Sequence, residues 1–344
     1  MGVHGSAQGA GVSVAHSDKP LVVITKPVPG EVLIDGVHLK VIPAQADDHT
    51  NPAARRARLL VGIRGARGLL IMFDDRVDEE FLDACGPQLA GLCTFAVGYD
   101  NIDLQACAKR GVVVTNTPDA VTEGTANMAI GLLLAVARMI VRGDRFVRSG
   151  RWAAEGNDFP EGWMGQHLCG QTMLIVGAGR IGRAVAHRAL AFGLRIMYAS
   201  PTGKIDWEGA PLCAERVELD EGLARADVVS LHCPLTPATR HLINGRRLGL
   251  MRPHAIIINT ARGPVIDQAA LITALSERRI LGAGLDVLDG EPSVPTELAA
   301  LDNVVFTPHI GSSERKYREL MTRIACENIA AILKGDRPRY PVTA

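Results

Sequence analysis

Short apolar runs rich in branched residues recur along the first third of the chain, with helix-like segments between them. They lie at Leu21–Thr25, Leu69–Met72 and Val112–Thr115. Continuous apolar runs of this length are typical of parallel strands that are buried on both faces, and the segments between them suit crossover helices. The pattern therefore predicts an α/β domain at the front of the chain.

A second series of the same kind begins near Thr172. The run from Thr172 to Ser200 has the order strand, glycine turn, helix and strand. Further strands are expected at Val228–Leu231, Ala255–Asn259, Gly282–Leu285 and Val304–Phe306. This order predicts a second, doubly wound parallel sheet, so the expected fold class is α/β with two Rossmann-like domains.

Two longer helices are expected outside these sheets. Pro118 and Asp119 signal a helix start, Glu123 complements the positive end of the helix dipole, and the helical pattern then runs to about Ser149. This helix could link the two domains. A second, amphipathic helix is expected at Glu314–Leu333, where it lets the chain return to pack on the first domain.

Length, charge and hydropathy narrow the class of protein. A chain of 344 residues favours two domains, and its 37 basic and 37 acidic residues give no bias toward nucleic acid or an anionic membrane. The apolar stretch Met128–Val141 is interrupted by Arg138 and is too short to span a bilayer, so we expect a buried helix there. Residues 1–20 carry no signal-peptide pattern and are expected to form a mobile tail.

Neither an arginine-rich segment nor the cysteines of the chain are expected to take part in catalysis. An arginine-rich segment is expected to form a solvated face; its members are Arg55, Arg56, Arg58, Arg64 and Arg67. Seven cysteines are scattered without a C-x-x-C pair, which suits neither a disulfide framework nor a zinc site. We therefore expect reduced cysteines, no metal and a cytoplasmic protein.

A glycine-rich loop joins the first strand and helix of the second series. In Gly177-Ala-Gly179-Arg180-Ile181-Gly182, the first glycine permits a tight turn, the second lets a pyrophosphate approach the backbone, and the third allows close helix packing. The amides at the helix start would then face the phosphates. The motif in this context predicts a dinucleotide site.

The end of the following strand bears on the choice of coenzyme. NAD sites usually carry a carboxylate there to hold the ribose hydroxyls, but this chain has Ala199. The hydroxyls of Ser200 and Thr202 and the cation of Lys204 would instead suit a 2′-phosphate. We therefore favour NADP(H), with NAD(H) as the alternative.

Three polar segments each follow a predicted strand of the second sheet. They are Asn259–Gly263, Leu285–Pro292 and Thr307–Gly311. Strand ends in such sheets border the ligand crevice, so their side chains are expected to meet there.

Arg262, Glu291 and His309 in these segments form a candidate catalytic trio. Reduction of a carbonyl by hydride needs a proton donor, and a histidine can fill that role near neutral pH. A carboxylate that hydrogen-bonds the imidazole fixes its tautomer, and an arginine fork can hold a substrate carboxylate while it stabilises the reacting oxygen. The sequence thus predicts a nicotinamide-dependent dehydrogenase.

From about Leu69 to Pro338 the chain resembles the D-isomer-specific 2-hydroxyacid dehydrogenases. The matching blocks are Val97–Asp103, Val114–Pro118, Gly177–Gly182, His232–Pro234, Asn259–Gly263, Asp286 with Gly290–Pro292, and Thr307–Gly311.

The resemblance implies a role for most of these blocks. Arg262 would bind and polarise the substrate, Glu291 would orient the acid/base His309, and Asp286 would contact the nicotinamide carboxamide. It further implies that the backbone at Ala96, Val97 and Gly98 meets the substrate carboxylate. Five further residues, by the same resemblance, lie near the coenzyme: Thr125, Cys233, Pro234, Thr260 and Ala261.

The family's architecture gives expectations for domains and assembly. A flavodoxin-like substrate domain would comprise residues 21–118 and 313–344, and a Rossmann coenzyme domain residues 119–312. The family generally forms homodimers through an arm that includes the long helix. Much of the family carries an aspartate where Ala199 stands, which supports the NADP(H) expectation.

The expected substrate is a small 2-keto acid, with glyoxylate and hydroxypyruvate as the best fits. Phe73–Asp78 and Phe146–Gly150 are also similar to phosphite dehydrogenases, but those carry a lysine at the position of Val97. Loss of that cation would remove an anchor for phosphite. A third alternative is a dinucleotide-dependent binding protein like the C-terminal binding protein corepressors.

Overall fold

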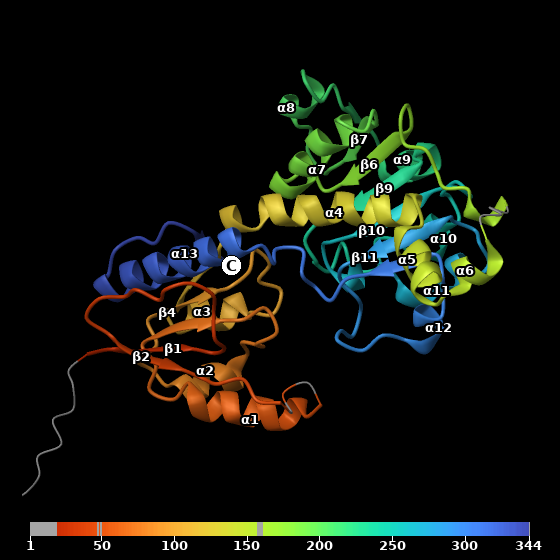
Figure 1. The fold of residues 1–344 in the computed structure, drawn as a ribbon. Coiled ribbons are helices and arrows are strands. Elements are labelled where there is room, and N and C mark those ends of the chain that lie inside the picture. The colour runs from red at the N-terminus through yellow and green to blue at the C-terminus, as the bar shows by residue number, and fades with distance from the viewer. Residues whose placement is uncertain (1–18, 47, 49, 157–160, 344) are drawn as a thin grey trace, which may run out of the picture.

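The computed structural model describes residues 19–46, 48, 50–156 and 161–343, so most of the expected tail lies outside the described residues. Two α/β units, each built on a parallel sheet, meet at a narrow waist (Figure 1). The predicted fold class is confirmed.

The first sheet has six strands in the order β13-β5-β4-β3-β1-β2. They are β1 (Leu21–Ile24), β2 (His38–Val41), β3 (Gly68–Ile71), β4 (Gly91–Thr94), β5 (Val113–Thr115) and β13 (Pro341–Val342). Every pair is parallel except β13 with β5, which is antiparallel. The order of β1 to β5 is the flavodoxin-like one.

The second sheet has seven strands, all parallel, in the order β12-β11-β10-β9-β6-β7-β8. They are β6 (Thr172–Val176), β7 (Arg195–Ala199), β8 (Glu215–Arg216), β9 (Val228–Leu231), β10 (Ile256–Asn259), β11 (Gly282–Leu285) and β12 (Val304–Phe306). The order reverses between β6 and β9, so a crevice opens at the carboxyl ends of these two strands.

Helices cover both sheets. The α-helices are α1 (Pro52–Gly62), α2 (Glu79–Cys85), α3 (Leu104–Lys109), α4 (Thr122–Ala137), α5 (Ile140–Arg148), α6 (Arg151–Glu155), α7 (Arg180–Leu190), α8 (Ile205–Glu208), α9 (Leu219–Arg225), α10 (Gly245–Leu248), α11 (Gln268–Ser276), α12 (Thr296–Ala299) and α13 (Arg315–Lys334). Three short 3₁₀ helices are η1 (Pro118–Ala120), η2 (Glu161–Trp163) and η3 (Gly263–Val265).

Each apolar run that predicted a strand lies within one residue of an observed strand at each end. The strands that the pattern missed carry weak signals. The four residues of β2 are all exposed at the sheet edge, and β4 contains glycine, cysteine and threonine in place of a branched apolar run. Strands of this kind are recognised by pairing with neighbours, which a single sequence does not show.

The single long helix expected from Pro118 to about Ser149 is wrong. The chain instead forms η1, then α4, then α5, with a bend of 62° between the two α-helices. Met139 at the break has φ +52°, a left-handed conformation that cannot continue a right-handed helix.

Two helices occupy the waist (Figure 1). The buried face of α4 packs on β10 and β11 through residues such as Leu132 and Ile258, and α13 packs on β3 and β4 through Ile329 and Ile332. In the described part of the chain, no single helix is long and apolar enough to cross a membrane; α4 and α5 reach that length and composition only together.

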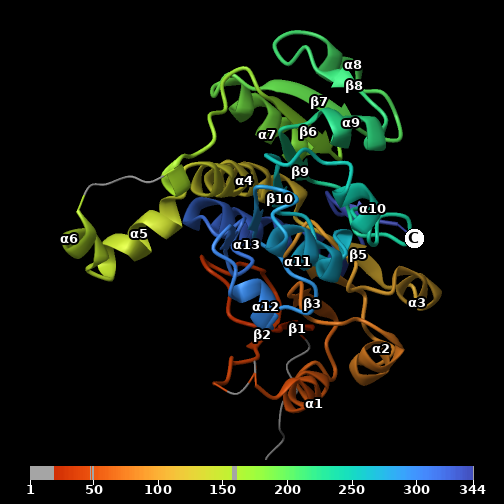
Figure 2. The same ribbon diagram turned by 90° about the vertical axis from the view of Figure 1, so that its right-hand side faces the viewer.

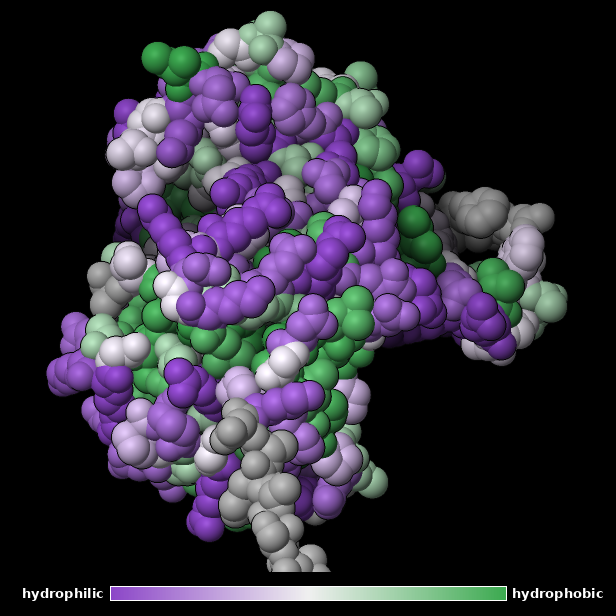
Figure 3. Space-filling model, turned by 90° about the vertical axis from the view of Figure 1, so that its left-hand side faces the viewer, coloured by the Kyte–Doolittle hydropathy of each residue, from purple (hydrophilic) through white to green (hydrophobic). Residues whose placement is uncertain are grey.

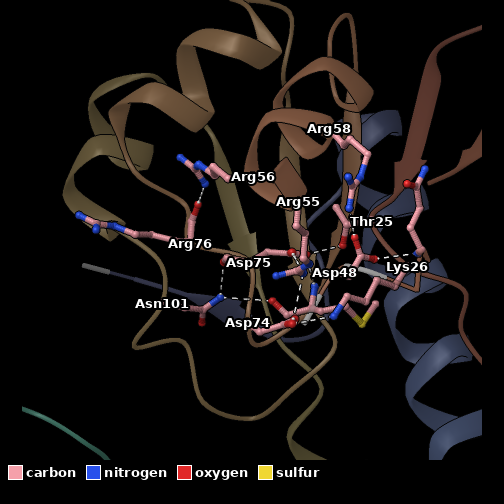
Figure 4. Close-up of polar contacts among 12 residues, drawn as sticks. Thr25, Lys26, Asp48, Arg55, Arg56, Arg58, Asp74, Asp75, Arg76 and Asn101 are labelled. Carbon is pink, nitrogen blue, oxygen red and sulfur yellow. Dashed lines mark hydrogen bonds and ion pairs between the residues drawn. The ribbon is translucent and has the colours of Figure 1, made fainter. Parts of the chain in front are cut away.

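The arginine-rich segment is more than a solvated face, so that expectation is only partly right. Three of its side chains are 19–30% exposed and form ion pairs, and Figure 4 shows those of Arg55 and Arg58. The pairs are Arg55 with Asp74 and Asp75, Arg56 with Asp78 and Glu80, and Arg58 with Asp48. The pairs of Arg55 and Arg56 tie α1 to the loop that follows β3 and to the start of α2, and the pair of Arg58 ties α1 to the segment before it.

Candidate active site

Two connected hollows lie where the domains meet. A cleft of about 740 Å³ runs along the glycine loop and the ends of β9 and β10. A cavity of about 80 Å³ adjoins it and shares Val97, Gly98, Ile181, Thr260 and Arg262 as lining.

A larger hollow lies elsewhere. A groove of about 830 Å³ separates α13 from the segment Gly30–Val37, on the face shown in Figure 3. None of the glycine loop, Arg262 or His309 lines it. The chemistry therefore belongs to the smaller hollows at the waist.

The glycine loop has the shape that a pyrophosphate needs. A Cβ at Gly177, which has φ +104°, would lie 2.6 Å from the Cys233 nitrogen, and one at Gly182 would lie 2.4 Å from the Gly177 oxygen. Gly179 has open space beside it and caps α7 with no side-chain hydrogen bond. Backbone amides at the start of α7 thus face an open cradle, which fits a dinucleotide phosphate.

Most of the residues expected near the coenzyme lie around these hollows. The cleft is lined by Gly179, Arg180, Ile181, Cys233, Pro234, Thr260 and Ala261, and the small cavity by Ala96, Thr125 and Asp286. Ser200, Thr202 and Lys204 lie outside both, on the loop that follows β7. The structure therefore brings the expected residues together except at the ribose end.

His309 and Glu291 form a hydrogen-bonded pair of 2.6 Å between Nδ1 and Oε1. The other Glu291 oxygen accepts the amide of Leu288 at 3.1 Å. Because Nδ1 is taken, Nε2 is the ring nitrogen available to a substrate. His309 lines the small cavity, and the ring of Phe73 packs against it with centroids 4.5 Å apart.

Opposing effects act on the carboxyl of Glu291. Burial favours the neutral form, but the hydrogen bond and charge of His309, the Leu288 amide and the charge of Arg262 outweigh it, so the pKa of Glu291 lies below its usual value. Glu291 is therefore ionised at neutral pH, which keeps it a hydrogen-bond acceptor for the Nδ1 of His309.

A second histidine near the cleft, His232, is poorly suited to protonate a substrate because its ring stays uncharged. His232 bonds the Ser230 hydroxyl through Nε2 at 2.8 Å, and burial lowers the pKa of its ring to about 3. It is therefore neutral at physiological pH, and His309 is the better candidate for a proton donor in this region.

Asp286 holds the loop that carries His309. Its buried carboxylate accepts the Thr307 hydroxyl at 2.5 Å and the amides of Ile310 and Gly311 at 2.9 and 2.8 Å, and its carbonyl accepts the His309 amide at 2.8 Å. His309 itself has φ +54°. Asp286, which is expected to contact the nicotinamide carboxamide, thus also holds His309 in an uncommon backbone conformation.

Arg262 projects from the loop after β10 into both hollows. Its carbonyl accepts the Asn259 side chain at 2.9 Å, and its guanidinium donates to Asp100 at 3.0 Å and to the Ala261 carbonyl at 2.8 Å. A Cβ at Gly98 would lie 1.8 Å from the guanidinium. The absence of a side chain at Gly98 thus makes room for Arg262.

The structure adds Arg318 of α13, which the sequence reasoning missed. It lines the small cavity, lies over Phe95 at 5.7 Å and donates to the Ser313 hydroxyl at 3.0 Å. Burial lowers the pKa of Arg318, against the charge of Asp286, although an arginine still remains charged. The first turn of α13 also carries Arg315 and Lys316, so the sequence pattern does not single out Arg318.

Phe73 was also missed as a site residue. The loop that carries it is anchored by Asp75, a buried carboxylate that accepts the Thr25 hydroxyl, the Met72 amide at 2.8 Å and Arg55 at 2.6 Å (Figure 4). Burial is the main reason that the pKa of Asp75 is raised. The arginine-rich segment therefore helps to fix one wall of the small cavity.

Comparison with known proteins agrees with this geometry. Residues 130–311 match the sequence model of the D-isomer specific 2-hydroxyacid dehydrogenase, NAD binding domain. A glyoxylate reductase of Pyrococcus furiosus is 47% identical over 284 residues, which cover 82% of this chain and 84% of that protein. A glyoxylate reductase of Thermococcus onnurineus is 45% identical over 322 residues, covering 93% of this chain and 95% of that protein.

Solved structures share the whole described architecture. The TT0316 protein of Thermus thermophilus superposes with a TM-score of 0.84 at 43% identity, covering 94% of this chain and all of that one. An NADPH-dependent glyoxylate/hydroxypyruvate reductase of Sinorhizobium meliloti, in complex with NADP and malonate, gives 0.78 at 31% identity, covering 94% and 97%. A D-lactate dehydrogenase of Aquifex aeolicus, complexed with NAD and lactic acid, gives 0.80 at 28% identity, covering 94% and 99%. This chain belongs to the D-isomer-specific 2-hydroxyacid dehydrogenase family, whose members use a nicotinamide coenzyme.

Proposed function

We propose that this enzyme reduces a small 2-keto acid, glyoxylate or hydroxypyruvate, to the 2-hydroxy acid. The observation that carries the proposal is the His309–Glu291 pair of 2.6 Å beside two guanidinium groups, Arg262 and Arg318, at one cavity of about 80 Å³. A cavity of this size suits a substrate of few atoms. The names of the relatives support the same substrate class.

The residues would act as follows. The guanidinium groups and the backbone at Ala96–Gly98 bind the substrate carboxylate, and Arg262 also polarises the carbonyl. A reduced nicotinamide coenzyme, when bound, supplies the hydride for the carbonyl carbon. His309 Nε2 gives its proton to the carbonyl oxygen, while Glu291 stabilises the imidazolium and keeps Nε2 aimed into the cavity.

NADP(H) is the proposed preferred coenzyme. The side chain of Ala199 offers no carboxylate to the ribose, and Ser200, Thr202 and Lys204 follow it with hydroxyl groups and a cation. A phosphate would be repelled by the aspartate that many NAD sites carry at this point. NAD(H) use at lower efficiency is compatible with the same site.

The test is a substrate panel run with both coenzymes. Oxidation of NADPH is followed by its absorbance with glyoxylate, hydroxypyruvate and other 2-keto acids, and phosphite is assayed in the oxidative direction. We expect turnover with glyoxylate or hydroxypyruvate and a higher kcat/KM for NADPH than for NADH. Absence of turnover with every 2-keto acid refutes the reductase. Coenzyme binding without turnover favours a dinucleotide-dependent binding protein, and phosphite oxidation favours a phosphite dehydrogenase.

A homodimer and a cytoplasmic location complete the proposal. The arm formed by α5 and α6 projects from the body (Figure 2) and exposes Ile140, Val147 and Trp152 by 46–55%. Exposed apolar groups on such an arm favour a contact with a second copy. All seven cysteines are free, which fits a reducing compartment. Analytical ultracentrifugation should give twice the mass of the chain.

The domain boundaries belong to the proposal as well. The substrate domain would comprise residues 21–118 and 313–344, and the coenzyme domain residues 119–312. The two sheets are composed of strands from these segments, which supports the division.

A further inference from the structure

Strand β8 brings an arginine to the ribose end of the coenzyme domain. This two-residue strand forms the edge of the seven-stranded sheet, and its parallel register pairs Arg216 with Tyr198 of β7. The next amide, that of Val217, donates to the Tyr198 carbonyl at 3.1 Å. Arg216 therefore stands beside the carboxyl end of β7, where a coenzyme's ribose is recognised in this fold.

The guanidinium of Arg216 reaches over the loop that leaves β7. It donates to the carbonyls of Pro201 at 3.1 Å and Ser200 at 3.4 Å. The preceding residue, Ala199, accepts the amide of Gly177 at 3.0 Å, so this loop begins against the glycine loop. An exposed cation thus lies directly beside the place where the adenosine of a dinucleotide would bind.

The acidic groups around Arg216 have other partners. Asp206 pairs with Arg183 at 3.5 Å, Glu208 accepts the Tyr198 hydroxyl at 2.6 Å, and Glu215 pairs with Arg225 at 2.6 Å. Within the described ranges, Arg216 has no carboxylate within 4.0 Å. A guanidinium that binds only carbonyl oxygens keeps donors and its charge for an incoming anion.

We propose that Arg216 binds the 2′-phosphate of NADP(H) and determines the coenzyme preference together with Lys204. Its fork can hold a phosphate in two charge-assisted hydrogen bonds, which a hydroxyl or a single lysine cannot match. This inference rests on the proposed NADP(H) preference and adds a residue from a different strand. A purely structural role, in which Arg216 only holds the loop carbonyls, is the alternative.

Binding of two coenzyme fragments separates these roles. The dissociation constants of 2′,5′-ADP and 5′-AMP are measured by isothermal titration calorimetry on the full chain, with the wild type, Arg216→Gln and Arg216→Lys. Arg195→Gln is the matched control, because Arg195 lies at the other end of β7 and also donates to a carbonyl, that of Gly170, at 2.6 Å. The kcat/KM values for NADPH and NADH are measured in parallel.

Arg216→Gln should weaken 2′,5′-ADP binding about 10- to 100-fold, the value of a charged hydrogen bond, and leave 5′-AMP within about twofold. Arg216→Lys should restore part of the loss, and Arg195→Gln should change neither fragment. Equal weakening of both fragments, or no change in either, overturns the inference while the wild-type preference for 2′,5′-ADP stands. A wild type that does not prefer 2′,5′-ADP refutes the proposed NADP(H) preference itself.

Discussion

The two ends of the cleft are built differently. At the catalytic end, Glu291 and Asp286 each accept two or more hydrogen bonds and hold His309 and its loop. Arg262 is held by Asp100, the Asn259 side chain and the Ala261 carbonyl. At the ribose end, Pro201 and Thr202 are exposed, and the loop is held mainly through its carbonyls. Rigid support suits the proposed chemistry, whereas the proposed coenzyme preference would depend on a few exposed side chains.

The largest effect should come from removing the acid at the catalytic end. His309→Asn is expected to lower kcat about 10³-fold while coenzyme binding persists, because the carboxamide cannot give up a proton. Asparagine tolerates the left-handed backbone that His309 adopts, so the loop should remain folded. Steady-state kinetics and coenzyme titration measure the two quantities.

His241→Asn is the matched control, since His241 also has a left-handed backbone, with φ +51°, and lines neither hollow. It should turn over at the wild-type rate. Substantial activity in His309→Asn would show that another group donates the proton. The catalytic end would then not differ from the ribose end in the way described above.

A smaller but still large effect is expected from Gly98→Ala. The added methyl would lie 1.8 Å from the Arg262 guanidinium, which must move away from Asp100. A displacement of about 1 Å in a positioned group can cost about 10²-fold, so kcat/KM for the keto acid should fall by that order with little change in Tm. Gly131→Ala, where a methyl meets open space, is the control. An unchanged kcat/KM would show that Arg262 need not be held so closely.

The sequence could predict the layers of this fold and that Arg262, Glu291 and His309 lie close together, but only part of the remaining site. Apolar runs such as Val228–Leu231 predict the buried strands. The polar residues that directly follow β10 and β12 predict where the site lies. The bend at Met139 and the cation of Arg318 depend on contacts with distant segments. A pattern along one chain does not contain such contacts.

Arg318 gives the next prediction, a change in substrate affinity. Arg318→Gln should raise KM for glyoxylate about tenfold, because one charged contact with the carboxylate is lost, while KM for NADPH remains unchanged. Arg323→Gln, further along α13 on its exposed face, is the control and should match the wild type. A fall in kcat with an unchanged KM would instead assign Arg318 to the reaction step.

The smallest expected effect is a pH-dependent difference in stability at the catalytic end. The folded-state pKa of Glu291 is lowered, so its ionised carboxylate contributes stability that is fully present above the unfolded value of 4.5 and is lost as the pH falls through the folded-state pKa. Glu291→Gln should therefore be less stable than the wild type by about 1 kcal/mol at about pH 6, and the gap should narrow below the unfolded value. Urea unfolding at a series of pH values measures this gap. A difference in unfolding free energy that stays constant as the pH falls below 4.5 would mean that packing, and not the charge on Glu291, supports His309. The catalytic end would then depend less on charged hydrogen bonds than its geometry implies.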